Sequence, residues 1–89
     1  LAKGQVSDLS KGFNLGGKPF SVYVRSKSAT EIVSDTLLNC KLICDNSFGN
    51  IPVPVGDWTP AAIVAIAPNA IDLQKYEIYW GAGEIIRNN

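Results

Sequence analysis

Apolar and polar residues alternate along a stretch in the middle of the chain, residues 36–45. One parity is apolar and holds Leu38, Cys40, Leu42 and Cys44. The other parity is polar, with Ile43 as its exception. Because successive side chains of a strand point to opposite faces, this alternation predicts a β-strand with one face in a core and one face in water.

Two further stretches alternate in the same way. In residues 20–25 the side chains expected to face the core are Phe20, Val22 and Val24. Those expected to face water are Ser21, Tyr23 and Arg25. In residues 74–80 one face would carry Tyr76, Ile78 and Trp80. Both stretches therefore predict strands, and the glycines of residues 81–83 are expected to end the second one.

Two apolar stretches contain prolines. Residues 51–55 place β-branched side chains on one face and prolines on the other, and proline cannot donate to a ladder, so we expect an edge strand. Residues 59–67 begin like a helix, because threonine at the N-cap and proline at the first position are typical helix starts. Ile63, Val64 and Ile66 favour a strand instead, so we expect a strand buried on both faces.

These patterns predict about five or six short strands at a spacing of roughly ten residues, which is typical of a small antiparallel β-sandwich or barrel. Turn-forming residues at 45–50 are expected to close a hairpin. Weaker extended segments are expected around Ile32 and Val33 and over residues 84–87. The chain has 89 residues, and we expect one β domain over residues 19–89.

Residues 1–18 are rich in glycine, serine and lysine, and their apolar side chains show no regular period. Two interpretations remain open. The segment is either a disordered terminus or an extended N-terminal arm that lies on a neighbouring subunit. In the second case Phe13 and Leu15 would anchor the arm.

The chain begins at Leu1 and contains no methionine. Because translation starts with methionine, we expect the numbering to begin after a cleavage or after a leader that has been removed. The sequence does not choose between these two origins.

Charge is sparse and balanced. Charged residues make up 18% of the chain, against a usual ~25%, and eight basic side chains cancel eight acidic ones. Net charge keeps the surfaces of soluble proteins apart, so we interpret the chain as a subunit covered by neighbours. The alternative is an ordinary monomer whose surface carries few charges. The dispersed basic residues argue against a nucleic-acid partner, and no apolar run approaches the ~20 residues of a membrane helix.

Reactive groups are scarce. The chain has no histidine, so a serine or cysteine nucleophile would lack its commonest base. Cys40 and Cys44 would lie ~13 Å apart in one strand, so we expect both to be reduced, buried and inert. The acidic residues are expected in turns or on outward faces. The sequence therefore predicts no catalytic, cofactor-binding or metal site, and no enzyme.

The aromatic residues are the candidates for recognition, and several gather late in the chain: Trp58, Tyr76, Tyr79 and Trp80. In one interpretation Trp58 and Trp80 close the ends of a barrel. In the other, some of them form an interface or a sugar-stacking surface, with Tyr79 exposed at the position that matches Tyr23. The candidate partner interface consists of Phe13, Leu15, Tyr23, Trp58, Tyr79 and Trp80.

Two segments of the second half carry a resemblance to a known group of proteins. Residues 51–58, IPVPVGDW, and residues 76–83, YEIYWGAG, are similar to segments of small all-β structural proteins of tailed-phage virions. That group includes auxiliary head, neck and spike-base proteins. The resemblance implies an accessory virion protein that packs in symmetric copies against capsid, portal or tail proteins, and it implies no catalytic residues.

We therefore expect a non-enzymatic, homo-oligomeric structural protein located in the virion of a phage, as a capsid decoration, neck or tail-associated subunit. Its partners would be copies of itself and larger virion proteins, with no nucleic acid and no membrane. The alternative is a small carbohydrate- or receptor-binding β-sandwich module that uses Trp58, Tyr79 and Trp80.

Overall fold

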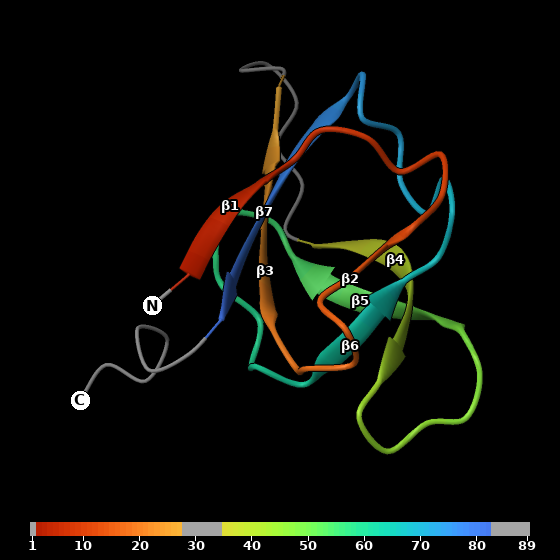
Figure 1. Ribbon diagram of the computed structural model, residues 1–89. Coiled ribbons are helices and arrows are strands. Elements are labelled where there is room, and N and C mark those ends of the chain that lie inside the picture. The colour runs from red at the N-terminus through yellow and green to blue at the C-terminus, as the bar shows by residue number, and fades with distance from the viewer. Residues whose placement is uncertain (1, 28–34, 83–89) are drawn as a thin grey trace.

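The computed structural model describes residues 2–27 and 35–82, and in these residues it is an all-β fold without a helix (Figure 1). The expected small antiparallel β-sandwich is confirmed. The described residues form seven strands. Their bounds are β1 Ala2–Val6, β2 Phe13–Asn14, β3 Ser21–Ser26, β4 Asp35–Leu42, β5 Gly49–Pro54, β6 Ile63–Ile66 and β7 Tyr76–Ala82.

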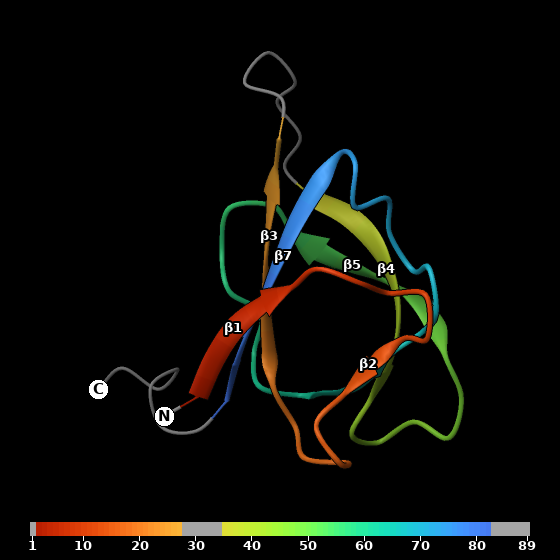
Figure 2. The ribbon, with the colours of Figure 1, turned by 45° about the horizontal axis from the view of Figure 1, so that its top comes forward.

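The strands form two sheets in which every pairing is antiparallel. Sheet A has the order β1-β7-β3 and sheet B the order β2-β6-β4-β5. Isolated bridges join the two sheets near β3, where Phe20 pairs with Ile63 and Val24 pairs with Val55. The sandwich is thus partly closed along β3, and its strands trace a ring in the view of Figure 2.

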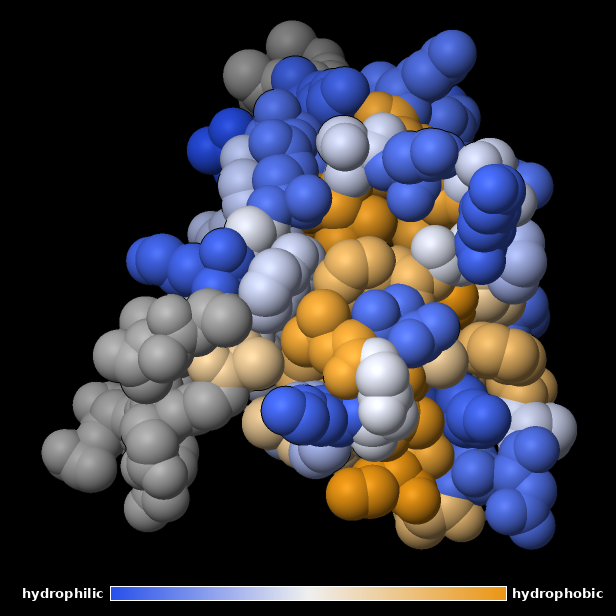
Figure 3. Space-filling model, viewed as in Figure 1, coloured by the Kyte–Doolittle hydropathy of each residue, from blue (hydrophilic) through white to orange (hydrophobic). Residues whose placement is uncertain are grey.

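The core lies between the two sheets. Sheet A contributes Val6, Val22, Val24 and Ile78, which occupy the inner parity of its three strands. Sheet B contributes Leu38, Cys40, Val53, Ile63 and Ile66. Some apolar surface remains uncovered and extends from the centre of Figure 3 to its lower edge. Burial of these side chains supplies the main driving force for folding, because few charged groups interrupt the apolar faces.

The strand predictions of the middle and second half of the chain are confirmed. β4 buries Leu38 and Cys40, as the alternation requires. β6 is a strand and not a helix, but the expected burial of both its faces is wrong. A register shift between Lys41 and Leu42 places Ile63 and Ile66, the partners of Leu42 and Cys40, both in the core, and the residues between them are only partly buried. β5 is an edge strand of sheet B, paired with β4 alone in that sheet, which is compatible with Pro52 and Pro54.

The prediction of an extended N-terminal arm over residues 1–18 is wrong. Ala2–Val6 forms β1, which pairs with β7, and Phe13–Asn14 forms β2, which pairs with β6. Val6 and Leu9 are each only 3% exposed and belong to the core. The segment therefore adds the strands that raise the count above the expected five or six. Its glycine-rich composition serves the turn, since Gly12 has φ +79° and leaves no room for a Cβ beside the Ile66 carbonyl.

Three local expectations are wrong. Ser21 is fully buried although it shares the outward parity of Tyr23 and Arg25. β4 ends at Leu42 in a turn, so Cys44 is exposed. β7 continues through Gly81 and Ala82, which pair with β1. The expected segments around Ile32 and Val33 and over residues 84–87 lie outside the described residues.

Candidate functional site: an aromatic concavity on sheet A

Three aromatic side chains lie side by side on the outer face of sheet A. Tyr23 of β3 and Tyr79 of β7 are partners in the strand register, and their ring centroids are 6.5 Å apart at an interplanar angle of 65°. Trp58 approaches Tyr23 from the other side, with centroids 5.4 Å apart at 54°. Such tilted and edge-on arrangements are the favoured geometries of aromatic pairs.

Trp58 reaches this face because its segment is hydrogen-bonded to the edge of β3. Gly56 turns the chain with φ +90°, and its N–H donates to the Val24 carbonyl at 2.7 Å. Three residues later, the Thr59 N–H donates to the Val22 carbonyl at 3.0 Å. The Thr59 hydroxyl in turn accepts the Val22 N–H at 3.0 Å. One hydrogen bond before Trp58 and two after it therefore hold this segment against β3, beside Tyr23.

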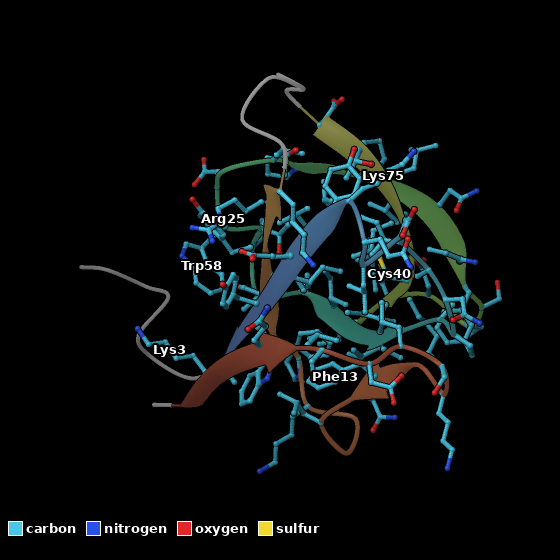
Figure 4. All side chains as sticks on the ribbon, turned by 90° about the horizontal axis from the view of Figure 1, so that it is seen from above. Lys3, Phe13, Arg25, Cys40, Trp58 and Lys75 are labelled. Atoms are coloured by element: carbon cyan, nitrogen blue, oxygen red, sulfur yellow. The ribbon has the colours of Figure 1, made fainter. Side chains whose placement is uncertain are left out.

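These rings border a concavity of about 490 Å³. It is lined by Lys3, Gly4, Gln5, Tyr23, Trp58, Tyr79 and Trp80. Figure 4 shows Lys3 and Trp58 on the same side of β3 and β7, with Phe13 and Cys40 on the opposite side. We call this site the aromatic concavity. Its polar groups come from β1, whose Lys3 and Gln5 share the outward parity with Tyr79.

Trp80 also lines the aromatic concavity, although in β7 it alternates with Tyr79 and so belongs to the inner face of the strand. It lies opposite Gly4 in the register, and a Cβ on Gly4 would come within 3.0 Å of the indole Nε1. The missing side chain therefore lets the indole lie against β1. On its inner side the ring faces Phe13, with centroids 6.0 Å apart. Trp80 thus joins the aromatic concavity to the core.

An ion pair lies next to the aromatic rings on the same face. Arg25 Nε donates to Glu77 Oε1 at 3.0 Å, and the Tyr79 hydroxyl donates to the same oxygen at 3.2 Å. The hydrogen bond from Arg25 is the main reason why the pKa of Glu77 lies below its ordinary value of 4.5. Glu77 lies on an outward face, as expected, and its carboxylate is ionised and oriented toward the Tyr79 hydroxyl.

The side chains of the aromatic concavity can make noncovalent contacts with a ligand or a partner. These side chains offer aromatic stacking, the ammonium group of Lys3 and the amide of Gln5. Across the described residues, no three histidine, cysteine, aspartate or glutamate side chains are placed to hold a metal ion. Burial raises the pKa of the Cys40 thiol to about 11, which disfavours the nucleophilic thiolate.

The structure brings together four of the six predicted interface residues: Tyr23, Trp58, Tyr79 and Trp80. Trp58 is 37% exposed and does not close a barrel end. The other two predicted residues lie elsewhere. Phe13 packs edge-on against Phe20, with centroids 5.4 Å apart, and Leu15 packs against the core. Neither anchors an arm.

Sequence reasoning missed the contribution of β1 to the site. Lys3 and Gln5 fell in the segment assigned to the arm, although polar and small or apolar residues alternate from Ala2 to Val6. That alternation was the available signal, and the glycine of the strand obscured it. Without a paired strand as context, five residues with one central glycine do not distinguish a strand from a tail.

Comparisons of this chain with protein-family models, with curated proteins and with solved structures find no match. Within residues 2–27 and 35–82, no helix has the length and apolar character to cross a membrane.

Proposed function

We propose that this protein is a non-enzymatic structural subunit of a tailed-phage virion, and that the aromatic concavity is its contact with a larger virion protein of the capsid, portal, neck or tail. The observation that carries the proposal is the grouping of Tyr23, Trp58 and Tyr79 on an outer sheet face. Tyrosine and tryptophan are the residue types that dominate the binding energy of protein interfaces.

The position of these rings supports a docking role over a purely structural one. They come from three segments that are distant in the sequence, and none of them belongs to the buried core between the sheets. Hydrogen bonds and the strand ladder fix the backbone that carries these rings. Rigid aromatic side chains lose little conformational entropy on binding, so their contacts contribute more to affinity.

The segments that resemble virion proteins also contribute to the aromatic concavity. Residues 51–58 and 76–83, which carry the resemblance, supply Trp58, Tyr79 and Trp80 to the aromatic concavity. Balanced charge and dispersed basic side chains favour protein partners over nucleic acid. These points support a virion location and a protein partner as one proposal.

The proposal is tested on particles purified from cells that encode the chain. We expect mass spectrometry to detect the wild-type protein in the particles in many copies. Replacement by Trp58→Ala should lower the incorporated amount at least about tenfold, as expected for an interface anchor. Lys75→Ala, at an exposed position away from the site, is the matched control. Particles without the wild-type chain would overturn the proposal.

A carbohydrate-binding module is the second candidate, and one observation favours it. The aromatic concavity has a volume within the range of small-molecule sites and combines ring faces with the polar side chains of Lys3 and Gln5. A glycan array probed with the purified protein separates the two candidates. Binding that Trp58→Ala and Gln5→Ala both abolish would support the module. Absence of binding to any glycan would leave the protein contact as the function of the site.

A further inference from the structure

Sheet B also exposes large apolar side chains, apart from the aromatic concavity of sheet A. Four large apolar side chains are exposed among the described residues, and three of them belong to β4 or to the turn between β4 and β5. These are Leu37, 56% exposed, Ile43, 63% exposed, and Phe48, 46% exposed. Leu37 lies on the outer face of sheet B and Phe48 lies next to Lys41 of the same face, whereas Ile43 lies in the turn. Large apolar side chains exposed on one face mark a candidate interaction surface.

The strand register shows how this surface is built. On the outer face of sheet B, Leu37 lies beside Pro52 and Asn39 lies beside Asn50. In the next row the Lys41 ammonium lies 5.6 Å from the centre of the Phe48 ring. Asp35 shares this parity at the far end of β4. We call the seven residues the β4–β5 face: Asp35, Leu37, Asn39, Lys41, Phe48, Asn50 and Pro52.

Edge-to-edge association is disfavoured here. β5 is the edge strand of sheet B, and its Pro52 and Pro54 carry no N–H for a ladder with another chain. A partner that covers the exposed apolar side chains must therefore lie on the face of the strands.

We propose that the β4–β5 face is the interface between two copies of this chain, related by a two-fold axis. The inference rests on the proposed function, because it names one of the contacts of the proposed subunit. The contact is distinct from the aromatic concavity, which belongs to sheet A and is left free for the larger virion protein.

The order of side chains along the face is self-complementary. A two-fold axis along the row of Asn39 and Asn50 places the amides of the two copies opposite each other, where each amide both donates and accepts. Leu37 and Pro52 of one copy then cover the Lys41 stem and the Phe48 ring of the other. This arrangement removes Leu37 and the Phe48 ring from water in both copies at once.

The charges of the face match the same arrangement. Asp35 lies at one end of β4 and Lys41 lies near the other. Reversal of the strand in the second copy brings the Lys41 ammonium of each copy toward Asp35 of the other, one row beyond Leu37. A contact between identical faces therefore brings opposite charges together, which favours a second copy as the occupant.

The test is the association state of the purified chain in a Cys44→Ser background, which excludes disulfide-linked dimers through that exposed thiol. Sedimentation equilibrium at several concentrations should show a dimer. Lys41→Asp and Asp35→Lys should each weaken it at least about tenfold, since like charges then face each other. An equimolar mixture of these two variants should dimerise again, because both pairs become complementary. Misfolding cannot produce that rescue.

The outcomes separate this inference from the proposed function. A monomer at every concentration, or a dimer unaffected by Leu37→Asp and Phe48→Asp, would overturn the β4–β5 interface. Neither result would alter the expected dependence of particle incorporation on Trp58. A dimer that both charge variants weaken and their mixture restores would support it.

Discussion

Arg25 and Glu77 lie opposite each other on β3 and β7, although 52 residues separate them in the sequence, and Arg25 Nε is 3.0 Å from Glu77 Oε1. The same carboxylate oxygen accepts the Tyr79 hydroxyl. This cross-strand pair connects the central strand of sheet A to β3 on the face that carries the aromatic concavity. The charge of the Glu77 carboxylate therefore affects both the pairing of β3 with β7 and the orientation of the Tyr79 side chain.

The ion pair predicts how stability depends on pH. Because the folded-state pKa of Glu77 is below its ordinary value, Glu77 stabilises the fold above about pH 4.5, and this contribution is lost as pH falls through the lowered folded-state pKa. Urea unfolding of the wild type between about pH 2 and pH 6 should show this loss. Glu77→Gln should flatten the profile over that interval. An unchanged profile would contradict the role of the pair.

Removal of the Thr59 hydroxyl should lower the stability of the fold. This hydroxyl accepts the N–H of buried Val22, and the residue is only 7% exposed. Thr59→Val keeps the shape but leaves that N–H unpaired, so the free energy of unfolding should fall by roughly 1–3 kcal/mol. Thr59→Ser retains the acceptor and should lose distinctly less. Equal losses for the two variants in denaturant unfolding would show that the hydroxyl is not the stabilising group.

Leu9 tests whether the N-terminal segment belongs to the fold. Leu9 is 3% exposed and packs in the core, so Leu9→Ala should lower the free energy of unfolding by roughly 2–5 kcal/mol. Lys18→Ala, at an exposed position in the same segment, should change it by less than about 0.5 kcal/mol. A chain whose first residues formed a loose arm would tolerate both substitutions.

The two thiols should differ in reactivity. Cys44 is exposed, whereas Cys40 is buried and its pKa is raised to about 11, mainly by burial and secondarily by Asp45. A thiol-specific reagent at about pH 8 should modify one group quickly in the native protein and the second only after unfolding. Cys44→Ser should remove the fast phase. Fast modification of both thiols would contradict the packing of Cys40 in β4.

The strands that were predictable are those with an undisturbed period of two. In β4, β3 and β7, alternating side chains fall on opposite sides of the sheet, so the pattern itself identifies the inner face. β6 was recognised from its β-branched residues Ile63, Val64 and Ile66. Ile43 interrupts the alternation of β4, and it is exposed in the turn where that strand ends.

The errors have a common physical origin. β1 is a weak strand on its own, because Gly4 costs backbone entropy and its Cβ position is taken by the Trp80 indole. Its stability comes from pairing with β7, a contact that no local window of sequence contains.

By itself, the sequence determined the all-β class, the inner faces of the main strands and the shortage of reactive groups, because these follow from composition and from side-chain alternation. Only the tertiary structure decided that residues 2–14 contribute two strands and that Trp58 lies on Tyr23. It also decided that the exposed side chains of Leu37 and Phe48 lie on sheet B, apart from the aromatic face of sheet A. These relationships depend on which strands pair and in what register, and long-range pairing is set by the packing of the whole core.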